Sequence, residues 1–276
     1  MKKEEIYKLY KKKIKLINKY NQFYFDKSAP IVSDKIYDDL KKDILLLESK
    51  YVFLKSNNSP GNSVGHKPSK NFLKSPHRIP MLSLANAFSE EDLINFEKKI
   101  LNFLSRKSDF KIFYSAEPKI DGISASITYK KGNFVKGLSR GDGKEGEDIT
   151  NNLNTIKDIP KHISSKDFPE EIDIRGEVFI QNSDFENMKD KFANPRNAAS
   201  GSLRQKKPED TKKIPLNFIA YTFGFENGLK VETQSEYLKK LEEWGFKVNP
   251  LNKLINGVKN LIHNYNEIEK KRADLD

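Results

Sequence analysis

The sequence predicts an α+β protein, in which a small N-terminal helical unit precedes a larger domain of antiparallel sheets mixed with helices. Residues 4–20 carry apolar side chains at three-to-four-residue spacing, the period of a helix, and Ser33 is a good N-cap for a second helix over about 34–49. Residues 56–80 are rich in Ser, Asn, Gly and Pro and indicate a linker or extended loop. We place the domain boundary near residue 72, which divides the chain into domains 1–72 and 73–276.

Beyond the linker, strand-like runs follow a helix. Ser89 and the acidic residues after it predict a helix to about Leu104, because acidic side chains favour a helix N-terminus. Strands are expected at 112–118, 123–130, 133–139, 172–180 and 215–224, the second and third joined by a Lys131-Gly132 hairpin. Helices are expected near 183–191, 196–204, 234–244 and 258–270. The hairpins favour antiparallel sheets over strict βαβ alternation.

Composition narrows the classes of protein. Hydrophobic residues make up 36% and charged residues 32% of the 276 residues. No apolar run approaches the roughly 20 residues of a membrane span, and the basic N-terminus lacks the apolar core of a secretory signal. The chain has no cysteine, which excludes a disulfide or a cysteine zinc site within it. We therefore expect a cytoplasmic protein with no membrane partner.

The charge balance favours a polyanionic partner. The net charge is +11 and the pI about 9.4, as in many proteins that bind nucleic acid. Lysine spread over ordinary exposed faces explains the same composition. Four of the seven arginines lie between residues 140 and 204, and arginine offers a planar fork that binds phosphate or carboxylate.

A lysine between a predicted strand and an Asp-Gly turn is the main candidate for chemistry. It is Lys119, in the segment EPKIDG at 117–122. The turn would hold its ammonium group accessible at the edge of the sheet. A lysine attacks phosphorus only after it has lost its proton, which nearby cations and partial burial favour. Taken alone, the four residues KIDG are better explained by an ordinary surface lysine beside a turn.

Two further motifs strengthen the assignment. The segment RGDG at 140–143 is followed by GED at 146–148, and such glycines let the backbone approach a ligand closely. Arg140 can reach a phosphate or a ribose there. Glu177, in RGEVF at 175–179, places a carboxylate on a strand where it could bind a ribose hydroxyl.

In this order, the motifs resemble those of the NAD⁺-dependent bacterial DNA ligases, over essentially the whole chain. The matching segments are EPKIDG at 117–122, RGDG at 140–143, GEDIT at 146–150, RGEVF at 175–179, ANPRNAASGSLRQ at 193–205 and MLSLANAF at 81–88. The resemblance implies a nucleotidyltransferase domain of the ATP-grasp-like ligase type whose last strands lie beyond residue 276. It also implies that residues 1–72 bind nicotinamide mononucleotide (NMN).

The resemblance assigns a role to each matching position. Lys119 would be the nucleophile that becomes the AMP-lysine, with Asp121 beside it as a second catalytic residue. Six residues would bind the adenylyl nucleotide. Glu117 would receive the adenine amino group, Tyr221 would stack on adenine, and Arg140 and Glu177 would hold ribose and phosphate. Ser83 and Leu84 would also contact the nucleotide. A strand tyrosine such as Tyr221 is more often a core residue. Arg196 and Arg204 would grip the DNA backbone near a nick, and no residue is assigned to a metal.

One face of the second predicted helix resembles the NMN site. Asp34, Tyr37 and Asp38 fall at i, i+3 and i+4, and Tyr24 precedes them by ten residues. In the family this face separates NAD⁺-using enzymes from ATP-using ones, although aspartates on a solvated helix face are common. Phe25 departs from the family, whose members more often carry a polar-tipped ring there.

The mechanism that the resemblance implies has three steps. Lys119 takes AMP from NAD⁺, AMP passes to the 5′-phosphate of a nick, and the 3′-hydroxyl displaces AMP to seal it. NAD⁺ would be the co-substrate, Mg²⁺ a cofactor, and nicked double-stranded DNA the partner, with association with the nucleoid during replication and repair. No obligate protein partner is evident. Zinc would belong only to a cysteine module C-terminal to this chain, which we expect to be a fragment of a longer ligase.

Two other functional classes remain open. The chain could be a non-catalytic remnant that binds NAD⁺ or DNA without turnover. It could instead be another lysine nucleotidyltransferase that uses ATP, such as an ATP-dependent ligase or a capping-type enzyme. The predicted helix face with Asp34, Tyr37 and Asp38 argues against ATP.

Overall fold

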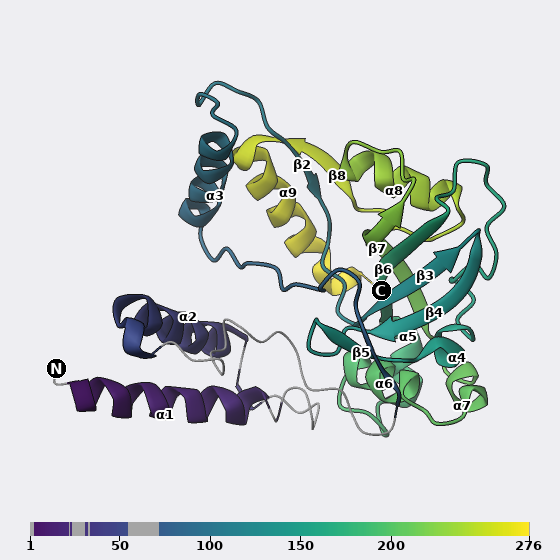
Figure 1. Ribbon diagram of the computed structural model, residues 1–276, viewed down its shortest axis with the longest axis horizontal. Helices are drawn as coiled ribbons and strands as arrows, with labels where there is room; N and C mark the ends of the chain where they lie inside the picture. Colours follow the sequence, from purple (N-terminus) through teal and green to yellow (C-terminus); the bar gives the residue numbers. More distant parts are fainter. Residues whose placement is uncertain (1–2, 22, 24–30, 33, 55–71, 276) are drawn as a thin grey trace. The chain divides into compact units, whose positions relative to one another are not determined.

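The chain of the computed structural model forms two compact units, whose helices and strands are labelled in Figure 1. Unit 1 comprises residues 1–82 and 138–149, and unit 2 comprises residues 83–137 and 150–276. The division differs from the boundary predicted near residue 72, which stays a prediction. The structure describes residues 3–21, 23, 31–32, 34–54 and 72–275.

Unit 1 begins with an antiparallel helical hairpin, as the sequence predicts. Helix α1 spans Lys3–Asn21 and helix α2 spans Asp34–Lys50, followed by a 3₁₀ turn at Val52–Leu54. The apolar positions meet in a small core of buried side chains, namely Ile6, Tyr10, Ile17, Leu40, Ile44 and Leu54. Two helices of this length bury little apolar surface, so polar contacts also fix their register.

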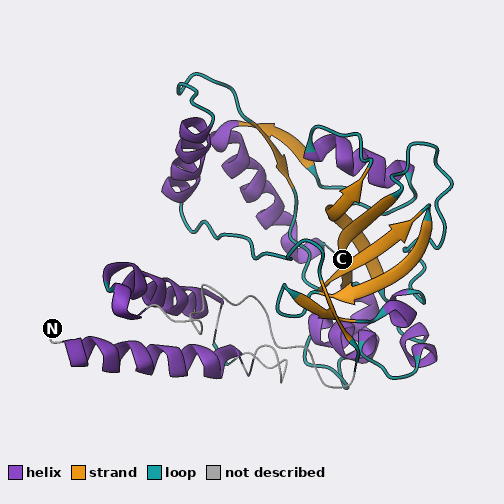
Figure 2. Cartoon of the chain, viewed as in Figure 1, coloured by secondary structure: helices purple, strands orange, loops and turns teal. Residues whose placement is uncertain are grey.

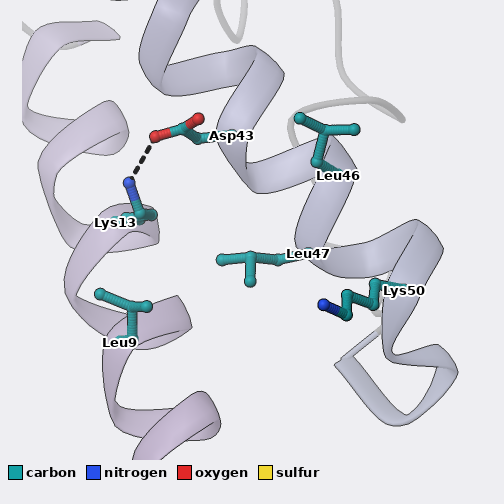
Figure 3. Close-up of a pocket in the computed structure, with 6 residues that line it drawn as sticks. All are labelled: Leu9, Lys13, Asp43, Leu46, Leu47 and Lys50. Atoms are coloured by element: carbon teal, nitrogen blue, oxygen red, sulfur yellow. Dashed lines mark hydrogen bonds and ion pairs between the residues drawn. The ribbon is translucent and has the colours of Figure 1, made fainter.

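Three pairs of side chains join α1 to α2 in antiparallel order. The buried Tyr10 hydroxyl donates to Glu48 Oε1 at 2.6 Å, and the Tyr37 hydroxyl donates to Asn21 Oδ1 at 2.7 Å. The Lys13 ammonium lies 2.7 Å from Asp43 Oδ2, beside a groove between the helices (Figure 3). The groove is lined by Leu9, Lys13, Asp43, Leu46, Leu47 and Lys50.

Unit 1 also contains a two-stranded antiparallel ribbon. Strand β1 (Lys74–Pro76) pairs with β5 (Glu145–Glu147), so that Ser75 lies opposite Gly146. The prediction of a loop over 56–80 is therefore wrong at β1. Residues 55–71 of that segment lie outside the described residues. A three-residue strand with a distant partner leaves no periodic pattern in the sequence, which explains the error.

The centre of unit 2 is an antiparallel sheet with strand order β4-β3-β6-β7 (Figure 2). The strands are β3 (Ile123–Lys130), β4 (Asn133–Ser139), β6 (Glu171–Phe179) and β7 (Asn217–Asn227). The predicted hairpin between β3 and β4 is confirmed. Lys131 and Gly132 have φ of 48° and 76°, as a type I′ turn requires at both central positions.

One face of this sheet is the apolar core of unit 2. The Tyr129 ring is fully buried and lies 5.9, 5.7 and 5.8 Å, between centroids, from Phe134, Phe168 and Phe246. Its hydroxyl donates to the Pro160 carbonyl at 2.6 Å, so the buried polar group is satisfied.

A smaller sheet and two helices form another part of unit 2. Strand β2 (Phe113–Ala116) pairs antiparallel with β8 (Lys253–Asn256), and helices α3 (Glu90–Phe103) and α9 (Gly257–Lys271) lie beside this ribbon (Figure 1). Helix α3 begins as predicted. The Ser89 side chain accepts from Asp92 N while Asp92 accepts from Ser89 N, which is a capping box.

The remaining helices of unit 2 are mostly short. They are α4 (Thr150–Leu153), α5 (Asn182–Phe185) with a 3₁₀ turn at Glu186–Met188, α6 (Pro195–Leu203), α7 (Pro208–Lys212), α8 (Gln234–Glu243) and a 3₁₀ turn at Arg272–Asp274. The predicted α+β class with antiparallel sheets is confirmed. Among the described helices, none has the length and apolar composition needed to cross a membrane.

Candidate active site

The candidate nucleophile lies on the loop between β2 and β3. Lys119 is exposed, as the sequence predicts for a lysine at the edge of a sheet. Gly122 ends the loop where the backbone passes close to β6. A Cβ atom at Gly122 would lie 2.3 Å from the Val178 carbonyl oxygen and 2.9 Å from Glu177 Cγ. Only glycine allows this approach, so the loop that carries Lys119 is held against the strand that carries Glu177.

The second face of the central sheet is polar, although much of it is buried. Residues that pair across β3 and β6 project to the same side. The polar pairs are Ser124 with Glu177, Ser126 with Arg175, and Thr128 with Asp173. All of these except Ser124 and Thr128 are buried. A buried polar sheet face is unusual for a structural core, which makes this face a candidate ligand site.

Glu177 is the carboxylate of this face that lies nearest the lysine loop. Its side chain is buried, and the Ser124 hydroxyl donates to its Oε2 at 2.7 Å. Burial raises the pKa of Glu177, while the Ser124 hydrogen bond and the charges of Lys119 and Arg196 oppose that rise. The charge of Asp121 raises this pKa further. The pKa of Glu177 therefore depends on four neighbouring side chains, namely Ser124, Lys119, Arg196 and Asp121.

Asp121 and Arg196 form an ion pair at this site. Arg196 Nη1 lies 2.8 Å from Asp121 Oδ1, with the aspartate side chain 78% exposed. Arg196 is the second residue of α6, where the Asn194 side chain caps the helix by accepting from Asn197 N, after Pro195 at the first position. An ion pair this exposed contributes little to stability, so its main effect is to orient both groups.

A second set of contacts surrounds Glu117. Its Oε1 accepts from Ser115 Oγ at 2.8 Å and from Gln234 Nε2 at 3.0 Å. The same Gln234 nitrogen lies 2.6 Å from the Tyr221 carbonyl oxygen. Two residues expected at the adenine base, Glu117 and Tyr221, are thus bridged by one amide.

Other predicted site residues lie elsewhere in unit 2. Arg204 is the C-terminal cap of α6, eight residues after Arg196, and its Nη1 lies 3.5 Å from Ser200 Oγ. Ser83 and Leu84 are exposed in the irregular segment before α3.

The remaining predicted site residues belong to unit 1. Arg140 begins a tight turn in which Gly143 N donates to the Arg140 carbonyl at 3.0 Å, and Gly141 and Gly143 have φ of 58° and 88°. Tyr37 and Asp38 are partly buried on α2. The side chain of Asp34 and the whole of Tyr24 lie outside the described residues.

Sequence reasoning missed two supporting residues. Ser124 belongs to a strict alternation of polar and apolar residues along β3, which a period-two count would have found. Gln234 carries no such signal, because it lies 117 residues from Glu117.

Comparison with known proteins defines the class of protein. Residues 69–276 match the model of the NAD-dependent DNA ligase adenylation domain, a nucleotidyltransferase fold. Residues 3–65 match the DNA ligase-like N-terminal NAD⁺-binding domain. The chain therefore belongs to the family of NAD-dependent DNA ligases, which confirms the resemblance found from the motifs.

Several curated relatives are named DNA ligase. That of Pelagibacter ubique is 64% identical over 266 residues, which are 96% of this chain and 39% of the relative. That of Parvibaculum lavamentivorans is 43% identical over 267 residues, 94% of this chain and 38% of the relative. That of Bradyrhizobium sp. (strain ORS 278) is 43% identical over 265 residues, 93% of this chain and 37% of the relative. The chain spans about two fifths of the length of these relatives.

Proposed function

We propose that this chain carries out the first step of NAD⁺-dependent DNA ligation, the transfer of AMP from NAD⁺ to Lys119. The observation that supports the proposal most strongly is the position of Lys119. It is an exposed lysine on a loop pressed against β6, within the electrostatic environment of a buried carboxylate and an arginine. The family matches supply NAD⁺ as the co-substrate.

The proposed step is a displacement at phosphorus. Lys119 Nζ, after releasing a proton to solvent, forms a bond to the α-phosphorus of NAD⁺. The phosphoanhydride bond breaks and its electron pair leaves on NMN. In a full-length ligase of this family, the same AMP would pass to the 5′-phosphate of nicked double-stranded DNA, and the 3′-hydroxyl would then displace AMP to form the phosphodiester. No protein partner is needed for these steps.

The side chains around Lys119 have distinct proposed tasks. Glu177 would accept from ribose hydroxyls, because a carboxylate fixed by Ser124 offers an oriented acceptor. Asp121, oriented by Arg196, would stay close to the nucleophile. Arg196 would stabilise negative charge that develops on the phosphoryl oxygens and later contact DNA.

The nucleotide and DNA would contact further residues, as the family resemblance implies. We assign adenine to Glu117 and Tyr221, the rest of the adenylyl nucleotide to Ser83, Leu84 and Arg140, NMN to Tyr24, Asp34, Tyr37 and Asp38, and the DNA backbone to Arg204. The NMN residues belong to the proposed domain 1–72 and the others to the proposed domain 73–276.

Magnesium is expected from the resemblance, to neutralise charge at the phosphates. Among the residues that the structure describes, however, no group of three or more His, Asp or Glu could hold a metal ion. The one carboxylate exposed beside Lys119, Asp121, is already paired with Arg196. The described residues do not form a complete metal site by themselves, and no step above depends on one.

Intact-mass spectrometry of the chain after incubation with NAD⁺ and Mg²⁺ tests the proposal. We expect an AMP-sized adduct on the parent and on Lys212→Ala, an exposed lysine of α7, but not on Lys119→Ala. An adduct formed with ATP and not with NAD⁺ would indicate another lysine nucleotidyltransferase. Retained NAD⁺ binding without an adduct would indicate a non-catalytic remnant.

A further inference from the structure

The amide of Gln234 occupies a position that fixes its orientation. Gln234 is the first residue of α8, and its Nε2 lies 3.0 Å from Glu117 Oε1 and 2.6 Å from the Tyr221 carbonyl oxygen. A carboxylate and a carbonyl can only accept hydrogen bonds. The amide must therefore present its NH₂ group to both, one N–H to each partner.

The carboxylate of Glu117 is consequently held on one side. Its Oε1 receives hydrogen bonds from both Gln234 Nε2 and Ser115 Oγ, which satisfies the two lone pairs of that oxygen. Its Oε2 receives none from the described residues. Ser115 lies near the end of β2 and Gln234 at the start of α8, so two separate elements orient the same carboxylate.

We propose that Gln234, with Ser115, is a positioning residue that makes Glu117 selective for a 6-aminopurine. The proposal rests on the proposed function, in which Glu117 meets the adenine base. Held in this way, Oε2 accepts a hydrogen bond from the exocyclic amino group of adenine. Hypoxanthine and guanine carry a carbonyl oxygen at the same place, which repels a carboxylate and cannot donate to it.

The same amide also fixes the second residue at the base. By donating to the Tyr221 carbonyl, Gln234 ties the start of α8 to β7 at the residue whose ring would stack on the purine. Loss of the amide removes one of the two hydrogen bonds that hold the carboxylate, together with the hydrogen bond to the backbone that carries the stacking ring. Selectivity between purines should therefore fall more than the rate of the chemical step.

The test compares NAD⁺ with nicotinamide hypoxanthine dinucleotide, which differs only at purine position 6. Equilibrium binding of both is measured by calorimetry, and the rate of adduct formation on Lys119 by intact mass in single-turnover experiments. We expect Gln234→Leu to lower the preference for NAD⁺ about tenfold, the effect of losing hydrogen bonds to a charged group. The loss should appear in the dissociation constant or KM rather than in kcat.

Thr233→Ala provides the matched control. Thr233 Oγ1 accepts from Glu236 N at 3.2 Å and caps the same helix, without contact to Glu117. The control should lower the melting temperature and leave the preference for NAD⁺ unchanged, whereas Ser115→Ala should lower the preference by an intermediate factor. A preference within twofold of the parent in Gln234→Leu would overturn the proposal, as would a parent chain that binds the two dinucleotides equally or binds neither.

The two readouts separate this proposal from the proposed function. If the parent prefers NAD⁺ in binding and Gln234→Leu loses that preference, the role of Gln234 is supported even where no adduct forms on Lys119. If the parent forms the adduct on Lys119 but binds both dinucleotides with equal affinity, the proposed function stands and the role of Gln234 fails.

Discussion

Gly122→Ala should damage the lysine loop more than the loss of a glycine ordinarily does. The 2.3 Å approach of the added Cβ to the Val178 carbonyl oxygen is 0.7 Å below the 3.0 Å that Cβ atoms keep. The obstacle is strand backbone in the middle of a sheet, so the loop must move instead. Overpacking of this kind costs about 1–3 kcal/mol. That lowers the melting temperature by about 2–12 °C at 2–4 °C per kcal/mol.

The functional loss from the same substitution should exceed the loss of stability. A displacement of 1 Å near reacting groups can cost about 100-fold in rate, so movement of the loop that carries Lys119 should slow adduct formation at least about tenfold. Differential scanning fluorimetry and single-turnover intact mass at 25 °C, where the variant stays folded, measure the two effects separately.

Gly201→Ala is the control for Gly122→Ala. Its Cβ would meet only Phe192 Cε1, at 3.3 Å, and alanine favours the helix α6 in which Gly201 lies. We expect little change in melting temperature or rate for this variant. The argument from close approach would be refuted if Gly122→Ala melted within 1 °C of the parent and formed the adduct within threefold of its rate.

Three further predictions follow from other contacts. Ser124→Ala should raise the pKa of Glu177 further, because it removes a hydrogen bond that lowers it, and should move the acidic limb of the adduct-formation pH profile upward; an unchanged limb would contradict this. Lys240, with Ser165, lowers the pKa of Asp167 to about 2, so Lys240→Met should lower the free energy of unfolding only slightly at pH 7, because this pair is exposed to solvent. The pair stabilises the fold above the ordinary pKa of an aspartate and loses this effect as the pH falls through about 2. If the parent and Lys240→Met differed in free energy of unfolding by urea as much at pH 2 as at pH 7, the ion pair would not be the cause of the difference. Arg204→Ala should weaken binding to nicked duplex and lower the salt slope by about one, and an unchanged slope would remove Arg204 from the interface.

Local patterns predicted most of the fold. The type I′ hairpin at Lys131-Gly132, the capped start of α3 at Ser89 and the helical hairpin of unit 1 each depend on residues close together in sequence. The short strands β1 and β8 escaped prediction because each has a partner far along the chain and too few residues to show a period.

The candidate site was predictable in part for the same reason. Motifs identify Lys119, Asp121 and Glu177, because each motif is contiguous in sequence. Their supporting contacts depend on register and on tertiary packing. Ser124 meets Glu177 only because β3 and β6 pair in one register, and Gln234 meets Glu117 only because α8 begins beside β7.

The supporting contacts share a consequence for the proposed chemistry. At the start of the lysine loop, Glu117 is held by Ser115 and Gln234, and at its end Gly122 is pressed against β6. Lys119 lies between these two fixed points, and its exposed side chain forms no hydrogen bond with the described residues.

Under the proposed function, the nucleophile combines a loop held at both ends with a side chain that forms no hydrogen bond with the described residues. The fixed loop limits the entropy lost when the α-phosphorus is aligned with Nζ. Because the ammonium group has no hydrogen bond to the described residues, no such bond has to break before it reacts. Under the proposed function, Lys119 must first accept AMP from NAD⁺ and later present it to a DNA end. A side chain anchored by its own ion pair would serve the first task at the expense of the second.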